Sequence, residues 1–377
     1  MSKVRLVLGL MATAIVSAIL TVLLIGYALG FSLEGATDMI RFFGVKRIIE
    51  TRYVNEVDGT KLVDGAINGM IESLGDPHSI YLKPDMYKSL QEHTSGTFGG
   101  IGVTMGFKDN KVTIISVLPE TPGEKAGLMA GDEILAVDSI SVKEYQPEEV
   151  ALHIRGSVGS DVTLTVLHDG DTKDVTITRD TITVRSVAGE MLPNNIGYIR
   201  IASFGENTGK EFSEEYDKLK NDGMEKMIID LRQNPGGLIT SCVDIAKMIV
   251  PKGTIVSVVQ RDGTKEEYTS DLEAVPYPLV VLIDGNSASA SEILAGALKD
   301  THAATLVGTK SYGKGSVQVV LPLFHDDGMK LTIAKYYTPS GVSIDGTGIE
   351  PDVAIDLPKN AASDVQLEKA KEVLLNK

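Results

Sequence analysis

The chain has 377 residues, a formal net charge of -15 and a single cysteine. Its length allows two or three domains with sizeable cores. The negative charge disfavours nucleic acid and anionic membrane surfaces as partners. Because Cys242 is alone, no intramolecular disulfide is possible, and its apolar surroundings favour a buried residue over a catalytic thiol. No His-Glu-x-x-His motif, cysteine pair or phosphate-binding glycine loop is present, so we expect no metal, cofactor or nucleotide.

The N-terminal segment predicts a membrane anchor over residues 1–33. Residues 6–31 contain no charged side chain, and Lys3 and Arg5 precede them. A helix of this length reaches about 39 Å, which exceeds a hydrocarbon core of about 30 Å. The two basic residues predict a cytoplasmic N-terminus, with the rest of this single-pass cell-membrane protein outside the cytoplasm. The segment Tyr27-Ala-Leu-Gly30 leaves removal of the anchor open as the alternative.

Residues 34–96 predict a helical arm. Apolar side chains such as Ile40, Phe43 and Ile48 recur there at helical spacing. Gly75-Asp-Pro77 interrupts the pattern. The arm is expected to serve packing or dimerisation. Residues 358–377 end in a short amphipathic helix capped by Asp364, so a homodimer formed through the N- and C-terminal helices is possible.

Residues 97–180 change to short alternating strands separated by glycine turns, with one helix over residues 147–155. The runs Gly99-Gly-Ile-Gly-Val103 and Ala126-Gly-Leu-Met-Ala-Gly-Asp132 together resemble a PDZ domain. Glycines let backbone N–H groups approach an anion, and the following strand can pair with a peptide. Candidate residues for binding a substrate's terminal carboxylate are Gly99, Gly100, Ile101, Gly102 and Val103.

Arg155 closes the predicted helix of this block. It is either a partner for the substrate carboxylate or for an acidic group of the next domain, or an exposed residue at a helix end.

Residues 181–357 predict an α/β domain. The strand candidates are residues 195–202, 227–231, 255–259 and 279–283, and the helix candidates are residues 208–221, 241–250 and 289–299. Alternation of this kind indicates a sheet with helices packed against it.

The run Asn286-Ser-Ala-Ser-Ala-Ser-Glu292 stands where a buried strand turns into a helix. Unpaired N–H groups and the positive end of the dipole at a helix N-terminus favour an alkoxide and an oxyanion. Three serines are candidates for the nucleophile, and the start of the helix mildly favours Ser289. The Ala290 amide is a natural oxyanion donor. Glu292 is expected to be structural.

A second oxyanion donor is expected from the turn Asn234-Pro-Gly-Gly237, at Gly236 or Gly237, although the segment alone also suits a simple strand-to-helix turn.

Lys314 is the candidate base, because no histidine lies near the serines in sequence. A base that works near neutrality needs a pKa of roughly 7 to 8, against about 10.4 for an ordinary lysine. Burial among apolar groups can supply that shift. Gln318 lies four residues further on, so in a strand it shares the face of Lys314 and can hold the amine without a charge. A surface lysine on a strand is the alternative.

These motifs, with Tyr336-Tyr-Thr-Pro-Ser-Gly341, Gly348-Ile-Glu-Pro-Asp352 and Leu74-Gly-Asp-Pro-His-Ser-Ile-Tyr81, are similar to the carboxyl-terminal processing peptidases, or tail-specific proteases. The resemblance implies a crotonase-like α/β protease domain after the PDZ block. It also implies Ser289 as nucleophile, Lys314 as base, Gln318 as its orienting group, and an oxyanion hole from Ala290 and the Pro-Gly-Gly turn. His302 and Ser311 depart from residues frequent in the family, a difference that bears on substrate preference.

The expected function is therefore a membrane-anchored serine endopeptidase that recognises free C-terminal tails of protein or peptide substrates. The alternative is a catalytically silent PDZ adaptor that binds tails at the cell surface. That alternative gives no reason for Ser289, Lys314 and Gln318 to occur together.

Overall fold

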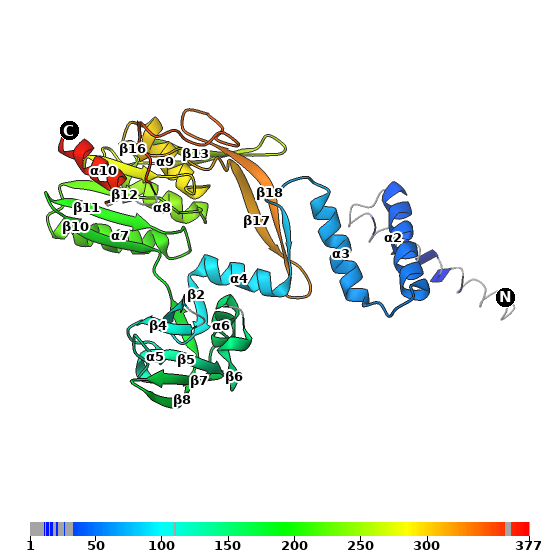
Figure 1. The fold of residues 1–377 in the computed structure, drawn as a ribbon. Coiled ribbons are helices and arrows are strands. Elements are labelled where there is room, and N and C mark those ends of the chain that lie inside the picture. Colours follow the sequence, from blue (N-terminus) through cyan, green and yellow to red (C-terminus); the bar gives the residue numbers. More distant parts are fainter. Residues whose placement is uncertain are drawn as a thin grey trace. The chain divides into compact units, whose positions relative to one another are not determined.

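The computed structural model describes residues 11, 13–14, 16–17, 20–21, 26, 33–108, 111–145, 147–358 and 363–376. The chain divides into two compact units, residues 1–81 and 82–377 (Figure 1). The predicted membrane anchor over residues 1–33 lies almost wholly outside the described residues. Among the residues that are described, no helix combines the length and the apolar character needed to cross a bilayer.

The first unit contains two described helices, α2 (Leu33–Arg52) and α3 (Gly59–Glu72). The Asp58 side chain caps α3 by accepting the N–H of Thr60 at 2.9 Å. Helical structure in this part of the chain is as the apolar spacing predicts. Many of the apolar side chains on these helices are exposed.

The second unit begins with α4 (Pro84–Ser95), which starts with proline at its first turn and ends at Gly96 in the left-handed conformation. It leads into a six-stranded antiparallel sheet in the order β3-β4-β5-β7-β8, with β6 paired to β5 off this path. In this sheet β3 lies at an edge. A pair of strands, β2 and β9, joins the entry and exit of this block. The elements are β2 (Thr97–Gly100), β3 (Val103–Lys108), β4 (Lys111–Val117), α5 (Pro122–Lys125), β5 (Glu133–Val137), β6 (Ile140–Ser141), α6 (Pro147–Ile154), β7 (Asp161–His168), β8 (Asp171–Thr178) and β9 (Asp180–Thr183).

A six-stranded sheet in the order β10-β11-β12-β15-β16-β19 forms the centre of the remaining chain, parallel except for the pairing of β10 with β11. Its central strands β12 and β15 are almost completely buried, which is typical of parallel sheets covered on both faces. The bounds are β10 (Val187–Leu192), β11 (Ile196–Ile201), α7 (Thr208–Asn221), β12 (Lys226–Asp230), α8 (Ile239–Ile249), β15 (Leu279–Ile283), α9 (Ala290–Asp300), β16 (Ala304–Gly308), β19 (Val353–Ala354) and α10 (Val365–Leu375).

The two faces of this sheet are covered by different helices (Figure 1). Ile229 and Val281 pack in one core with residues of α7, α8 and α9. Ile228 and Val280, one position earlier in the same strands, pack in another core with Ala370 and Leu374 of α10. This division follows from the alternation of side chains along a strand. The C-terminal helix thus buries its apolar side within its own chain.

An antiparallel ribbon completes the unit. Strand β18 (Gly328–Tyr337) pairs first with β17 (Ser316–Pro322) and then with β13 (Gly253–Gln260), and β13 also pairs with β14 (Lys265–Ser270). The start of the ribbon is held close to α4, because a side chain at Gly328 would meet the ring of Tyr87 at 2.5 Å.

Candidate active site

Ser289 occupies a strained turn between β15 and α9. Its φ is 54°, a conformation that non-glycine residues rarely adopt and that is frequent at functional sites. The strain is held by a hydrogen bond from the Ser289 N–H to the Glu292 carboxylate at 2.8 Å. Ser289 therefore lies at the positive end of α9, the position at which the sequence places it.

Glu292 is fully buried and binds the segments of both candidate reacting residues. Its carboxylate accepts the N–H groups of Ser289 and Lys314, the latter at 2.9 Å, together with the Gly313 N–H and the Ser311 hydroxyl. Burial raises the pKa of Glu292, while these four donors oppose the rise. The predicted structural role is thus a specific one, since this side chain sets the position of one backbone segment against the other.

Tyr336 of β18 contacts the same two segments from the carbonyl side. Its hydroxyl lies 3.1 Å from the Ser289 carbonyl oxygen and also contacts the Lys314 carbonyl oxygen. Burial raises the pKa of Tyr336 well above its ordinary value, and the charge of Glu292 adds to this, so the hydroxyl stays a donor.

Two backbone amides are available for an oxyanion. The Ala290 N–H begins α9, where helical N–H groups have no intrahelical acceptor. Gly236 lies against it, because a side chain there would come within 2.9 Å of the Ala290 nitrogen. The Gly236 N–H itself donates to the Asn234 side chain at 2.9 Å, so Gly236 is not a free donor in this structure. Gly237 is left as the second candidate.

One cavity of about 450 Å³ joins these groups. Ser289, Lys314, Gln318, Gly236 and Gly237 all line it. The Gln318 amide nitrogen donates to the hydroxyls of Ser316 at 2.9 Å and Thr332 at 3.2 Å. These bonds fix the amide and leave its oxygen as an acceptor. The other side chains that line the cavity come from α4, the β11–α7 and β12–α8 connections and the ribbon.

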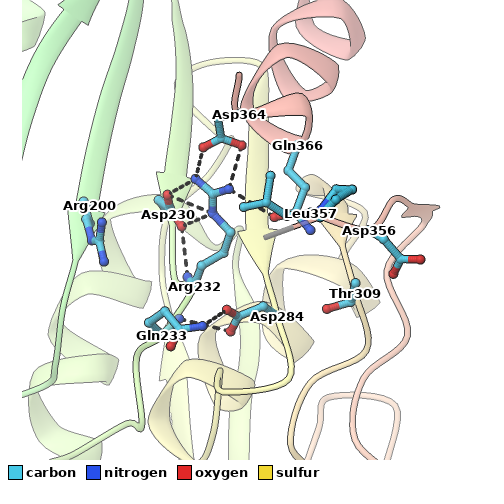
Figure 2. A pocket seen from close by; sticks show the side chains of 11 residues that line it. Arg200, Asp230, Arg232, Gln233, Asp284, Thr309, Asp356, Leu357, Asp364 and Gln366 are labelled. Carbon is cyan, nitrogen blue, oxygen red and sulfur yellow. Dashed lines mark hydrogen bonds and ion pairs between the residues drawn. The ribbon is translucent and has the colours of Figure 1, made fainter. Parts of the chain in front are cut away.

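Behind the two turns lies a second cavity of about 580 Å³, shown in Figure 2. Arg232 lies at its centre, only 11% exposed, and binds Asp230 and Asp364 with both sides of its guanidinium group at 2.6–3.1 Å. Asp284 accepts the N–H groups of Gln233 and Asn286 at 3.0 Å, which ties the β12 turn to the β15 turn. The hydrogen bonds of Asp284 thus connect the loop that carries Gly237 with the loop that carries Ser289.

None of the residues predicted to bind a substrate carboxylate lines the cavity that contains Ser289 and Lys314. They belong to the PDZ-like block. Gly99 and Gly100 belong to β2, Ile101 is buried, Gly102 has a φ of 78°, and Val103 begins the edge strand β3. Arg155 is exposed, and its guanidinium carbon lies 4.1 Å from the centre of the Phe98 ring. Cys242 is buried in α8, as predicted, and its thiol donates to the Ala290 carbonyl at 3.2 Å. Within the described ranges no cluster of His, Cys, Asp or Glu suits a metal ion.

Comparison with known proteins decides the family. Residues 195–355 match the model of peptidase family S41, residues 99–178 match that of the PDZ domain, and residues 33–86 match that of the activating protease CtpB N-terminal domain. A carboxy-terminal-processing protease of Bartonella bacilliformis is 38% identical over 335 residues, which cover 85% of this chain and 76% of that protein. The chain belongs to the carboxy-terminal processing proteases of family S41. It is a serine-type endopeptidase, and the alternative of a catalytically silent adaptor is not retained.

Other members of the family agree with this assignment. The carboxy-terminal processing protease CtpA of Bacillus subtilis is 38% identical over 368 residues, covering 95% of this chain and 78% of that one. Among solved structures, the photosystem II D1 C-terminal processing protease is 30% identical, with a TM-score of 0.51 over 88% of this protease and 96% of that chain. A putative S41 protease from Bacteroides fragilis, 16% identical with a TM-score of 0.55 over 88% and 97% of the two chains, shares the fold.

Neither the contacts of Tyr336 nor the ion pairs of Arg232 are evident from the sequence. Tyr336 lies in a motif that served only for the family resemblance, and no pattern in the sequence points to its role. Asp364 was predicted as a helix cap, and it accepts the Leu367 N–H at 3.0 Å in that role. Its second role requires the chain to fold back onto Arg232, which no local pattern indicates.

Proposed function

We propose that this protease is anchored in the cell membrane with its catalytic body outside the cytoplasm, and that it cleaves protein substrates captured by their free C-terminal tails. The predicted division of the chain is kept in this proposal: anchor 1–33, helical arm 34–96, PDZ domain 97–180, protease domain 181–357 and C-terminal helix 358–377. The observation that carries the chemistry is the single cavity lined by Ser289, Lys314, Gln318 and Gly237.

The proposed chemistry is acyl transfer by a Ser-Lys pair. The neutral Lys314 amine takes the proton of the Ser289 hydroxyl as its oxygen attacks the scissile carbonyl. The oxyanion is stabilised by the N–H groups of Ala290 and Gly237. The resulting ammonium gives its proton to the leaving amine, and water then releases the acyl group by the same steps. The Gln318 side-chain oxygen accepts a hydrogen bond from the lysine and orients it.

Replacing either reacting residue tests the pair. Ser289→Ala and Lys314→Ala are each expected to abolish cleavage of a tailed substrate, with circular dichroism unchanged, because each removes one partner of the proton transfer. Lys310→Ala is the matched control, since Lys310 is exposed and pairs with Glu350 at the surface. Turnover by either variant at the rate of the natural protease refutes the assignment.

Tail capture is supported by the free edge of β3, which follows the glycine-rich segment Gly99–Val103 and is open to strand addition. Arg155 is kept as a further candidate contact for the substrate. Amidating the C-terminus of a peptide substrate removes the carboxylate, so KM is expected to rise while kcat changes little. Equal kcat/KM for amidated and free tails contradicts this part of the proposal.

A homodimer is also proposed, through the helices of the first unit. Ile40, Phe43, Ile48 and Met70 are each more than half exposed there. The C-terminal helix was predicted as a second contact, but its apolar side is packed on the sheet, so the proposal rests on α2 and α3.

A further inference from the structure

The catalytic cavity has an unusual charge for this protein. The chain carries 51 acidic residues against 36 basic ones. Yet among the described side chains that line the cavity there is no aspartate or glutamate, while Lys314, Lys330 and His93 are present. The nearby carboxylate of Glu292 lies outside the lining and is used by backbone N–H groups and Ser311. The wall that faces the substrate is therefore neutral or positive, never negative.

Lys330 is placed by the register of the ribbon. Gln318 pairs with Thr332, and Val320 pairs with Lys330. Lys330 therefore lies two residue positions along the ribbon from Gln318, in the direction away from Lys314. At about 3.4 Å per residue this is about 7 Å, or two residues of an extended substrate. Both Lys330 and Tyr336 line the cavity, on either side of an irregularity in the pairing of β18 with β17 between Thr332 and Ala334.

Lys330 is half-buried, and within the described part of the chain no carboxylate lies within ion-pair distance of it. The other lysine of this strand, Lys335, pairs with Asp345 at 3.3 Å and does not line the cavity. Val320 and Leu90 also line the cavity and offer apolar surface to a lysine stem. A half-buried ammonium without a fixed counterion favours an incoming anion, because the low dielectric of a cleft strengthens the attraction.

We propose that Lys330 is a specificity-determining residue that reads a carboxylate of the substrate near the scissile bond. The source is the side chain of an aspartate or glutamate, or a chain end that reaches this subsite. The inference rests on the proposed proteolytic function of the same cavity and adds a substrate class to it: segments with an acidic residue a few positions from the cleaved bond. The tail carboxylate held by the PDZ-like block is a separate contact.

The test uses the full-length protease in detergent and peptides that share one cleavage site and one free tail. Single positions on both sides of the scissile bond carry Glu, Gln or Lys in turn, and kcat/KM is measured for each. At one position the natural protease is expected to prefer Glu over Lys by about tenfold, a size suited to one partly exposed ion pair and its repulsive counterpart. In Lys330→Gln the values of kcat/KM for the Glu and Lys peptides become similar, and in Lys330→Glu the Lys peptide is cleaved faster. High salt reduces the preference, since screening acts on exposed charges.

Lys247→Glu is the matched control. It makes the same change of charge on an exposed residue of α8 outside the cavity, and it keeps the preference of the natural protease. A second peptide set, ending at the sensitive position with a free or amidated terminus, separates a chain-end carboxylate from a side-chain carboxylate. If Lys330→Glu keeps the natural preference at every position, the inference is wrong. If the natural protease cuts none of the peptides, the proposed function itself fails, which is a different outcome from cutting them all without regard to charge.

Discussion

At the scale of single residues, the site is a strained serine held from two sides. The φ of 54° at Ser289 persists because its N–H is bound by Glu292 and its carbonyl oxygen by the Tyr336 hydroxyl. The same two side chains bind the N–H and the carbonyl oxygen of Lys314. One carboxylate and one phenol thus hold the backbone of the proposed nucleophile and the backbone of its base in fixed positions.

Tyr336→Phe tests this positioning. The ring remains and the hydroxyl is lost, so the two carbonyl groups are released and the reacting groups are less well aligned. We expect kcat to fall by about tenfold to a hundredfold with KM nearly unchanged, because misalignment affects the chemical step rather than substrate binding. Steady-state kinetics on a tailed peptide measure both constants.

Tyr337→Phe makes the same chemical change one residue later, where the side chain does not line the cavity. It is expected to leave both constants unchanged. A kcat for Tyr336→Phe equal to that of Tyr337→Phe would show that the hydroxyl has no positioning role.

Sequence reasoning reached Ser289, Lys314 and Gln318 because their chemistry is local: a serine at a helix start, and an amine and an amide on one strand face. The roles of Tyr336 and Gly237 depend on how β18 and the β12 turn approach α9. No single segment contains that information. For the same reason, the sequence does not distinguish Gly236 from Gly237 as the oxyanion donor. The structure does, because the Gly236 N–H donates to the Asn234 side chain.

At the scale of elements, the predicted strands with continuous apolar runs are confirmed. Strands β11, β12, β13 and β15 and helices α7, α8, α9 and α10 lie within a few residues of their predicted ranges. Strand β18 was not predicted, because it carries polar residues such as Lys330, which lines the cavity, and Thr332, which binds Gln318. Polar residues at functional positions interrupt the pattern on which a strand prediction depends.

Helix α10 is held against the sheet by the ion pair between Asp364 and Arg232 as well as by apolar contacts. Burial opposes ionisation of Asp364, but hydrogen bonds from Arg232 outweigh it and lower the pKa of this carboxyl group. A lowered pKa in the folded state adds stability that is present above the ordinary aspartate pKa of about 4. It is lost as the pH falls through the folded value.

Asp364→Asn keeps the cap of α10 and removes the charge. At neutral pH the variant is expected to unfold with about 1 kcal/mol less free energy, a modest value because the Asp364 side chain is 34% exposed. The difference should begin to shrink below about pH 4, where the carboxylate of the unfolded chain becomes protonated, and should be lost as the pH falls through the lowered folded pKa. Urea unfolding followed by circular dichroism at several pH values measures it. Asp356→Asn, at an exposed carboxylate of the same cavity, serves as control, and a difference that does not vary with pH would argue against the ion pair.

At the scale of the whole molecule, the first unit exposes apolar surface that a soluble helix pair would normally bury. Ile40 is 74% exposed, Phe43 56% and Ile48 61%, and their spacing places them along one side of α2. A second copy of the chain is the proposed partner, because the same face on both copies forms a self-complementary contact. A charge in such an interface loses its water without gaining a partner, which destabilises the dimer but not the monomer.

Ile40→Glu combined with Phe43→Glu is therefore expected to convert the protein from dimer to monomer, as measured by sedimentation velocity in detergent. Asn55→Glu places the same carboxylate in the exposed loop between α2 and α3, and it should leave the dimer intact. The catalytic cavity lies wholly within residues 82–377, so cleavage of a short tailed peptide by the monomeric variant should continue at a similar rate. A natural protein that already sediments as a monomer would exclude this interface, whereas a monomeric variant without activity would show that the dimer supports catalysis.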